Sequence, residues 1–163
     1  MYVPVLSGVR WRSVFATLVL GCLESVSQTR VFLTLGNMLI QETRLIGDAL
    51  RSITALLPDS WNLDVDSQAP RQADAVINLT GPDGEGVSFL VEAKTSGAPT
   101  GRLLASLREQ ASATELPLLY VSDYIGPILR EALAADAISF ADATGWVRVT
   151  SGAPLILLTG QGA

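Results

Sequence analysis

The sequence predicts an α/β domain of the α+β kind, in which a mixed central sheet is flanked by helices. Two stretches predict it. Residues 73–96 have the pattern of two strands joined by a turn-forming run at 81–86, which begins an antiparallel sheet. Further on, an apolar strand run at 116–121 lies between two helical patterns, and a strand-helix-strand succession gives parallel pairing. At 163 residues and 48% hydrophobic composition, the chain can bury the core of one domain.

The chain divides into an N-terminal apolar extension at 1–37 and a domain at 38–163. The apolar run at 14–23 is shorter than the roughly 20 residues that a membrane-spanning helix needs, and Glu24 follows it. Three interpretations stay open for this extension: a packed helix or hairpin, a segment that precedes the domain proper, and a targeting segment. We expect no membrane association.

A helix is predicted at 38–57, where Pro58 ends an apolar pattern with helical spacing. Glu42 lies on the apolar side of this helix, three residues after Leu39 and four before Ile46. A carboxylate in that position is costly unless it pairs with an arginine or binds a cation, and both interpretations remain open. The apolar positions of the helix are Leu39, Ile46, Leu50, Ile53 and Leu57.

The remaining elements follow in the order of helix, three strands, helix, strand, helix and short strands. Trp61, Leu63 and Val65 alternate with polar residues and predict a half-buried strand before the hairpin. After the hairpin we expect a helix at 102–114, a strand at 116–121, a helix at 127–137, two strands within 139–149 that turn at 144–145, and a strand at 154–158.

The inventory of side chains excludes several kinds of chemistry. Without histidine, the chain has no Ser-His-Asp triad, no histidine-dependent nuclease site and no His-ligated zinc. Cys22 is the single cysteine, so an internal disulfide is impossible and a reducing, cytoplasmic compartment is expected. Carboxylates are the plentiful hard ligands, and they suit Mg²⁺ or Mn²⁺.

Asp74, Glu92 and Lys94 are predicted to meet across the hairpin. Side chains two apart on a strand share a face, and a turn centred on 83–84 sets Asp74 opposite about residue 93, or one residue away if the loop length differs. Lys94 is the single lysine among eleven basic residues. Two carboxylates can hold a divalent cation that binds a phosphate oxygen and lowers the pKa of a bound water, and a lysine can orient that water. The alternative is a cross-strand ion pair with no further role.

This arrangement resembles the PD-(D/E)xK nuclease superfamily, which includes restriction endonucleases and archaeal-type Holliday junction resolvases. Asp74 and Glu92-Ala93-Lys94 match its signature, although Ala73 stands where the name-giving proline would be. The resemblance implies a restriction-endonuclease-like αβββαβ core from about residue 38 to residue 121. It also implies Mg²⁺-dependent endonuclease activity, with Asp74 and Glu92 as metal ligands, Lys94 positioning the attacking water and Glu42 as an auxiliary ligand.

DNA is the partner that this resemblance implies. Arg71, Arg102 and Arg108 flank the predicted site and could meet phosphates, with surface solvation as the alternative for each. Gln110 falls in the following helix, where some members of the superfamily carry a polar residue. The net charge of −5 lacks the basic field of a typical nucleic-acid binder, so we expect an additional DNA-binding domain or partner.

Two other functions remain open. The first is a catalytically silent DNA-binding or transcription-regulatory module on the same fold, which works with an additional DNA-binding domain. The second is a structural or toxin-antitoxin-like interaction protein whose apolar N-terminal segment makes a homodimer. A homodimer is equally compatible with a nuclease.

Overall fold

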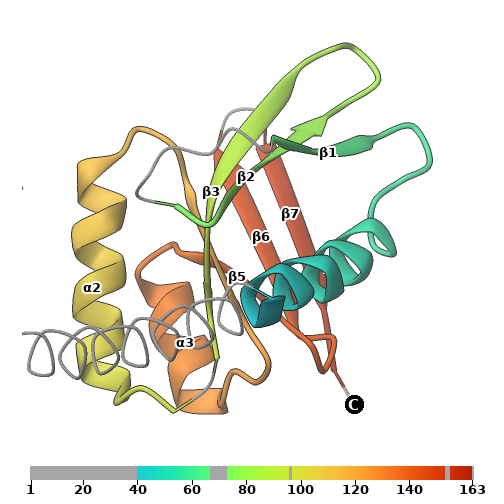
Figure 1. Cartoon of the computed structure of the whole chain (residues 1–163). Helices are drawn as coiled ribbons and strands as arrows, with labels where there is room; N and C mark the ends of the chain where they lie inside the picture. The colour runs from blue at the N-terminus through green and yellow to red at the C-terminus, as the bar shows by residue number, and fades with distance from the viewer. Residues whose placement is uncertain (1–39, 67–72, 96, 153–154, 163) are drawn as a thin grey trace, which may run out of the picture. The chain divides into compact units, whose positions relative to one another are not determined.

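A mixed β-sheet runs through the centre of the domain (Figure 1). The computed structural model describes residues 40–66, 73–95, 97–152 and 155–162, and within these ranges the sheet has seven strands that lie side by side in chain order. The central strands β3, β4 and β5 pair in parallel, and the pairs on either side are antiparallel. The strands are β1 (Asn62–Asp66), β2 (Ala75–Thr80), β3 (Gly86–Lys94), β4 (Leu118–Ser122), β5 (Ser139–Asp142), β6 (Val147–Gly152) and β7 (Leu155–Gly160).

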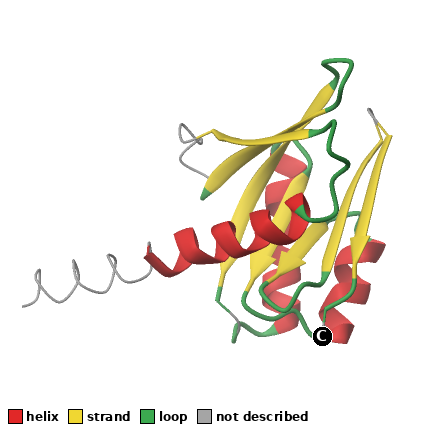
Figure 2. Cartoon of the chain, turned by 90° about the vertical axis from the view of Figure 1, so that its right-hand side faces the viewer, coloured by secondary structure: helices red, strands yellow, loops and turns green. Residues whose placement is uncertain are grey.

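Helices cover both faces of this sheet. The described part of the chain begins in a helix at 40–54, which lies across the near face of the sheet in Figure 2. Helices α2 (Thr100–Ala113) and α3 (Pro127–Ala135) lie against the opposite face. Because α2 and α3 each connect neighbouring parallel strands, and such connections share one handedness, both are placed on the same side.

Each face has its own apolar core. Leu45, Ala49 and Ile53 of the first described helix pack on one face, against strand residues such as Val91 and Val121. On the other face Leu104 and Leu107 of α2 and Leu133 of α3 pack over Leu90, Tyr120 and Phe140. Neighbouring strand residues alternate between these two cores, as the pleat of a strand requires.

The predicted order of elements is confirmed, but several boundaries differ. The helix predicted at 38–57 ends at residue 54, because the chain tightens there into bonds to carbonyls three residues back. Helix α2 begins at Thr100, two residues before the predicted start. Strand β4 begins at Leu118 and not at residue 116, because the N–H of Leu116 donates to the hydroxyl of Thr114 in a turn.

The burial of two elements also corrects the prediction. Leu45 and Ala49, which the predicted stripe omitted, are buried with Ile53, so the helix is rotated slightly toward them. Strand β1 lies at the edge of the sheet. Its Leu63 is partly buried against the core as the alternation predicts, whereas Val65 is exposed at 48%. Residues 1–37, Cys22 among them, and Arg71 lie outside the described residues. Within the described ranges, no helix has the length and apolar character that crossing a membrane demands.

The hairpin of β2 and β3 has a register one residue away from the predicted one. Ala75 lies opposite Val91, one residue from the predicted register, and the N–H of Asp74 donates to the carbonyl of the same Val91. The loop at 81–85 has an odd number of residues and is closed by a bond from the N–H of Gly81 to the carbonyl of Glu85. A φ of 79° at Gly84, which glycine adopts without strain, allows this turn.

Candidate functional site

Asp74, Glu92 and Lys94 meet at the carboxyl end of β3. The Nζ atom of Lys94 lies 2.9 Å from Oε1 of Glu92 and 3.8 Å from Oδ2 of Asp74. Glu92 and Lys94 share a face because they are two residues apart on one strand, and the hairpin places Asp74 beside them. The three side chains therefore form one charged cluster on two neighbouring strands.

The backbone of the hairpin holds Asp74 in place. Its N–H donates to the carbonyl oxygen of Val91 at 3.0 Å, the residue that is also paired with Ala75 at the start of β2. Its Oδ2 atom accepts the N–H of Ala93 at 2.7 Å. The Asp74 carboxylate is thus bound to the backbone of Ala93, the residue between Glu92 and Lys94.

Burial increases across the cluster from Lys94 to Glu92. The exposed fraction of the side chain is 43% for Lys94, 24% for Asp74 and 11% for Glu92. Glu92 continues the face on which Leu90 packs beneath α2, so its carboxylate lies at the margin of an apolar core. Because a buried carboxylate needs a partner, the ammonium of Lys94 is part of what stabilises Glu92 in this position.

Glu42 contributes a third carboxylate from the helix at 40–54. Burial, then repulsion from the charges of Asp74 and Glu92, raises the pKa of Glu42 above its ordinary value, while the charge of Lys94 lowers it in part. These electrostatic interactions place Glu42 in the same neighbourhood as the other three groups. Three acidic side chains and one lysine therefore come from two strands and one helix.

Lys94 is held in its charged form. Burial lowers the pKa of Lys94, but the hydrogen bond with Glu92 and the charges of Glu92, Asp74 and Glu42 outweigh it, so that the pKa is raised. At neutral pH the side chain is therefore an ammonium that donates hydrogen bonds. It can orient a water molecule or stabilise negative charge, and it has no lone pair with which to accept a proton.

Two neighbours on β4 were missed by the sequence analysis. Tyr120 lies opposite Glu92, and Ser122 lies opposite Lys94, in the parallel pair of β3 and β4. Burial and the charges of Asp123 and Glu92 raise the pKa of Tyr120, against the hydrogen bond with Ser122 and the charge of Lys94. The available signal was a pair of hydroxyl residues two positions apart at the end of an apolar run, and it predicts that both lie on one face.

The three expected DNA-contacting residues that the structure describes lie in different environments. Arg102 is exposed in the first turn of α2, after the short connection that follows Lys94. The guanidinium of Arg108 is bound by Asp136 at 2.7 and 3.2 Å, which ties α2 to the end of α3. In the last turns of α2, the Oε1 atom of Gln110 is buried, and the described residues offer it no hydrogen-bond partner.

The donor chemistry of the cluster fits a hard divalent cation. Among the described residues, no group of three or more acidic, histidine or cysteine side chains has the arrangement of a protein-only metal site. Mg²⁺ does not require one, because it commonly binds through one or two carboxylates and keeps waters or substrate phosphates as its other ligands. Asp74 and Glu92 can supply such a pair.

Comparison with models of known families, with curated proteins and with solved structures gives no match for this chain.

Proposed function

We propose that this domain is a Mg²⁺-dependent phosphodiesterase that hydrolyses DNA in the manner of an endonuclease. The observation that carries the proposal is the convergence of Asp74 and Glu92 on the ammonium of Lys94, 3.8 and 2.9 Å away. Two carboxylates and a cationic donor on adjacent strands supply what phosphoryl transfer to water needs: a cation site and stabilisation of developing negative charge.

Each residue has a defined part in this proposal. Asp74 and Glu92 bind the divalent cation, and Glu42 is an auxiliary ligand from the helix. When bound, the cation polarises a phosphate oxygen and makes water a better nucleophile at neutral pH. Lys94, which stays protonated, donates a hydrogen bond that positions the attacking water or stabilises the charge of the transition state.

The order of elements supports a restriction-endonuclease-like fold for the domain. A helix precedes the meander of β1, β2 and β3, and α2 then leads to β4, which is parallel to β3. This is the αβββαβ order of the PD-(D/E)xK superfamily, and Asp74 and Glu92-Ala93-Lys94 occupy the hairpin positions of its signature. Because the net charge is −5, we propose that a further DNA-binding domain or partner, or a second copy in a homodimer, supplies additional contacts to DNA.

The test is cleavage of DNA by purified protein. Supercoiled, linear and branched DNA are incubated with Mg²⁺ or Mn²⁺, in parallel with a Lys94→Ala variant purified in the same way. We expect cleavage by the unchanged protein and a loss of about 10²-fold or more in the variant, the range of a removed charge-stabilising donor. Absence of cleavage on every DNA form contradicts the proposal, and equal cleavage by both proteins identifies a contaminant.

One observation favours a catalytically silent DNA-binding module as the second candidate. The ammonium of Lys94 bridges the two carboxylates, which is also the geometry of an ion-pair cluster that needs no metal. This candidate predicts that the protein binds DNA with the same affinity with and without Mg²⁺. It also predicts that Glu92→Gln leaves this affinity unchanged, whereas metal-dependent binding that the substitution abolishes favours the nuclease.

A further inference from the structure

A cavity of about 290 Å³ lies at the carboxyl ends of the parallel strands, beneath the first described helix. The sheet side of the cavity is formed by the residues that directly follow the three parallel strands: Thr95 after β3, Asp123 after β4 and Ala143 after β5. In open α/β sheets the carboxyl ends of parallel strands are the common location of ligand sites. The helix side is lined by Gln41, Arg44, Leu45 and Asp48.

The cavity adjoins the candidate site at two points of the chain. Thr95 follows Lys94 directly, and successive strand residues point to opposite faces, so the cavity lies on the other face of the sheet end from Lys94. Gln41 immediately precedes Glu42 on the helix. A ligand that passes over the end of β3 can therefore contact the acidic cluster and the cavity together.

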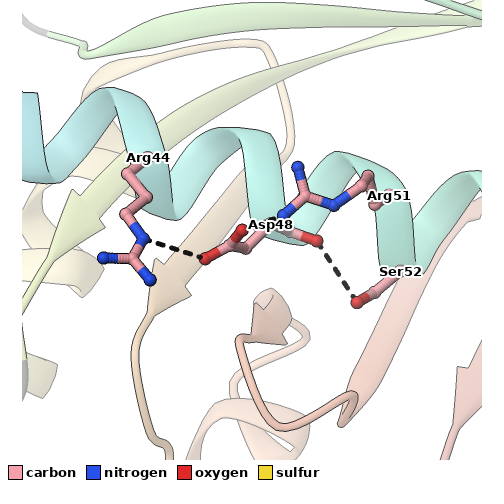
Figure 3. Close-up of polar contacts among 4 residues, drawn as sticks. All are labelled: Arg44, Asp48, Arg51 and Ser52. Carbon is pink, nitrogen blue, oxygen red and sulfur yellow. Dashed lines mark hydrogen bonds and ion pairs between the residues drawn. The ribbon is translucent and has the colours of Figure 1, made fainter.

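Arg44 is the cation of this cavity, and it is free to turn toward an anion. Figure 3 shows Arg44 and Arg51 on either side of Asp48. Arg51 makes the close contact with the carboxylate, whereas Nε of Arg44 lies 3.9 Å from Oδ2 and its side chain is 84% exposed. If Arg44 moves away to a ligand, Asp48 keeps its partner in Arg51. The local charge balance thus permits Arg44 to bind a phosphate at little cost.

We propose that this cavity holds one nucleotide of the substrate, next to the scissile phosphodiester, with Arg44 bonded to its phosphate. The inference rests on the proposed function and specifies its substrate contact. At about 290 Å³ the volume lies just below the roughly 300 Å³ at which drug-sized ligand pockets begin, which limits the occupant to about one nucleotide. Gln41 offers an amide, and Asp123 offers a carboxylate that can accept hydrogen bonds from the amino groups of a base. The two acidic residues of the lining disfavour a continuous phosphate backbone.

The test measures binding of a short, fluorescein-labelled single-stranded deoxyoligonucleotide to the full chain by anisotropy. Ca²⁺ replaces Mg²⁺, and the salt concentration is varied. Arg44→Ala is compared with Arg51→Ala, a matched control on the same helix that also contacts Asp48 but does not line the cavity. We expect Arg44→Ala to weaken binding about tenfold, the size of one lost charge-assisted hydrogen bond. The slope of log affinity against log salt is expected to fall by about 0.7, one contact on single-stranded DNA. We expect Arg51→Ala to weaken binding by less than Arg44→Ala does, because Asp48 then holds Arg44 more firmly, and to leave the salt slope unchanged.

A second variant tests the cavity itself. Ala143→Phe fills it with an uncharged side chain at an exposed position, so we expect weaker binding with an unchanged salt slope. Equal affinities of unchanged protein, Arg44→Ala and Ala143→Phe overturn the inference, as does equal weakening by both arginine variants. If the unchanged protein cleaves DNA while these variants bind it normally, the proposed function stands and this inference alone fails. If Arg44-dependent binding occurs without any cleavage, the nucleotide cavity is supported and the catalytic assignment fails.

Discussion

Replacing Lys94 by methionine separates the charge of this side chain from its packing. Methionine keeps most of the apolar stem but leaves Glu92, whose side chain is 11% exposed, without its ammonium partner at 2.9 Å. Removing one member of a fully buried pair costs about 3–5 kcal/mol, whereas an exposed pair contributes about 0.2–1 kcal/mol. Lys94 is 43% exposed, so we expect an intermediate loss of about 1–3 kcal/mol.

Thermal unfolding followed by circular dichroism measures this loss. For a domain of this size, 1 kcal/mol corresponds to a shift of about 2–4 °C, so Tm is expected to fall by roughly 2–12 °C. If the carboxylates form a cation site, Tm should also depend on Mn²⁺. Because a divalent cation can replace the missing ammonium beside Glu92 and Asp74, Mn²⁺ should raise the Tm of Lys94→Met by more than that of the unchanged protein.

A matched variant distinguishes this effect from a general response to metal. Arg108→Met breaks another ion pair, with Asp136, whose carboxylate is 23% exposed and lies at the end of α3. We expect Arg108→Met to lose less stability, below about 1 kcal/mol, and to respond to Mn²⁺ as the unchanged protein does. An equal Mn²⁺ shift in all three proteins, or no shift in any, would refute the reasoning that the carboxylates beside Lys94 form a cation site.

Three further substitutions test other parts of the structure. The pKa of Glu42 is raised above its ordinary value of 4.5, so stability is lost as pH rises through that raised pKa. Glu42→Gln should therefore raise the free energy of unfolding at pH 7, by less than about 1 kcal/mol, and with it Tm, but should leave both unchanged near pH 4. Asp142 is fully buried and accepts four hydrogen bonds, so Asp142→Ala should cost about 3–5 kcal/mol in urea unfolding, and a loss below about 1 kcal/mol contradicts this role. A Cβ at Gly86 would meet a carbonyl oxygen at 2.6 Å, so Gly86→Ala should destabilise the fold by about 1–3 kcal/mol. Gly101→Ala, in open space on α2, should be neutral or stabilising. Changes of the same sign in the free energy of unfolding for both variants would count against the close approach at Gly86.

The order of elements could be predicted because each has a strong local signal. Alternation, helical spacing and the turn-forming residues at 81–86 are properties of short segments, and the structure confirms them in sequence. Burial depends on distant parts of the chain and was predicted less well. Val65 alternates like a half-buried residue, but it lies near the end of the edge strand β1 and is exposed, whereas Leu63 on the same strand packs against the core.

The cluster of Asp74, Glu92 and Lys94 could be predicted because a hairpin fixes which residues lie together once its turn is recognised. The register was wrong by one residue, since the length of the loop at 81–85 depends on the conformation of Gly84. The spacing of Tyr120 and Ser122 predicts that they share a face, but their place beside Glu92 and Lys94 could not be predicted, because parallel pairing with β3 is set by the whole crossover through α2. Metal binding and DNA hydrolysis remain proposals.

Mn²⁺ titrated into the protein by calorimetry tests the central claim most directly. Asp74→Asn removes one proposed ligand with little change of shape, and Asp64→Asn makes the same change at an exposed position on β1. We expect one Mn²⁺ site in the unchanged protein and in Asp64→Asn, and its loss or strong weakening in Asp74→Asn. Binding that is missing from the unchanged protein, or that survives intact in Asp74→Asn, contradicts the claim that this cluster holds a metal.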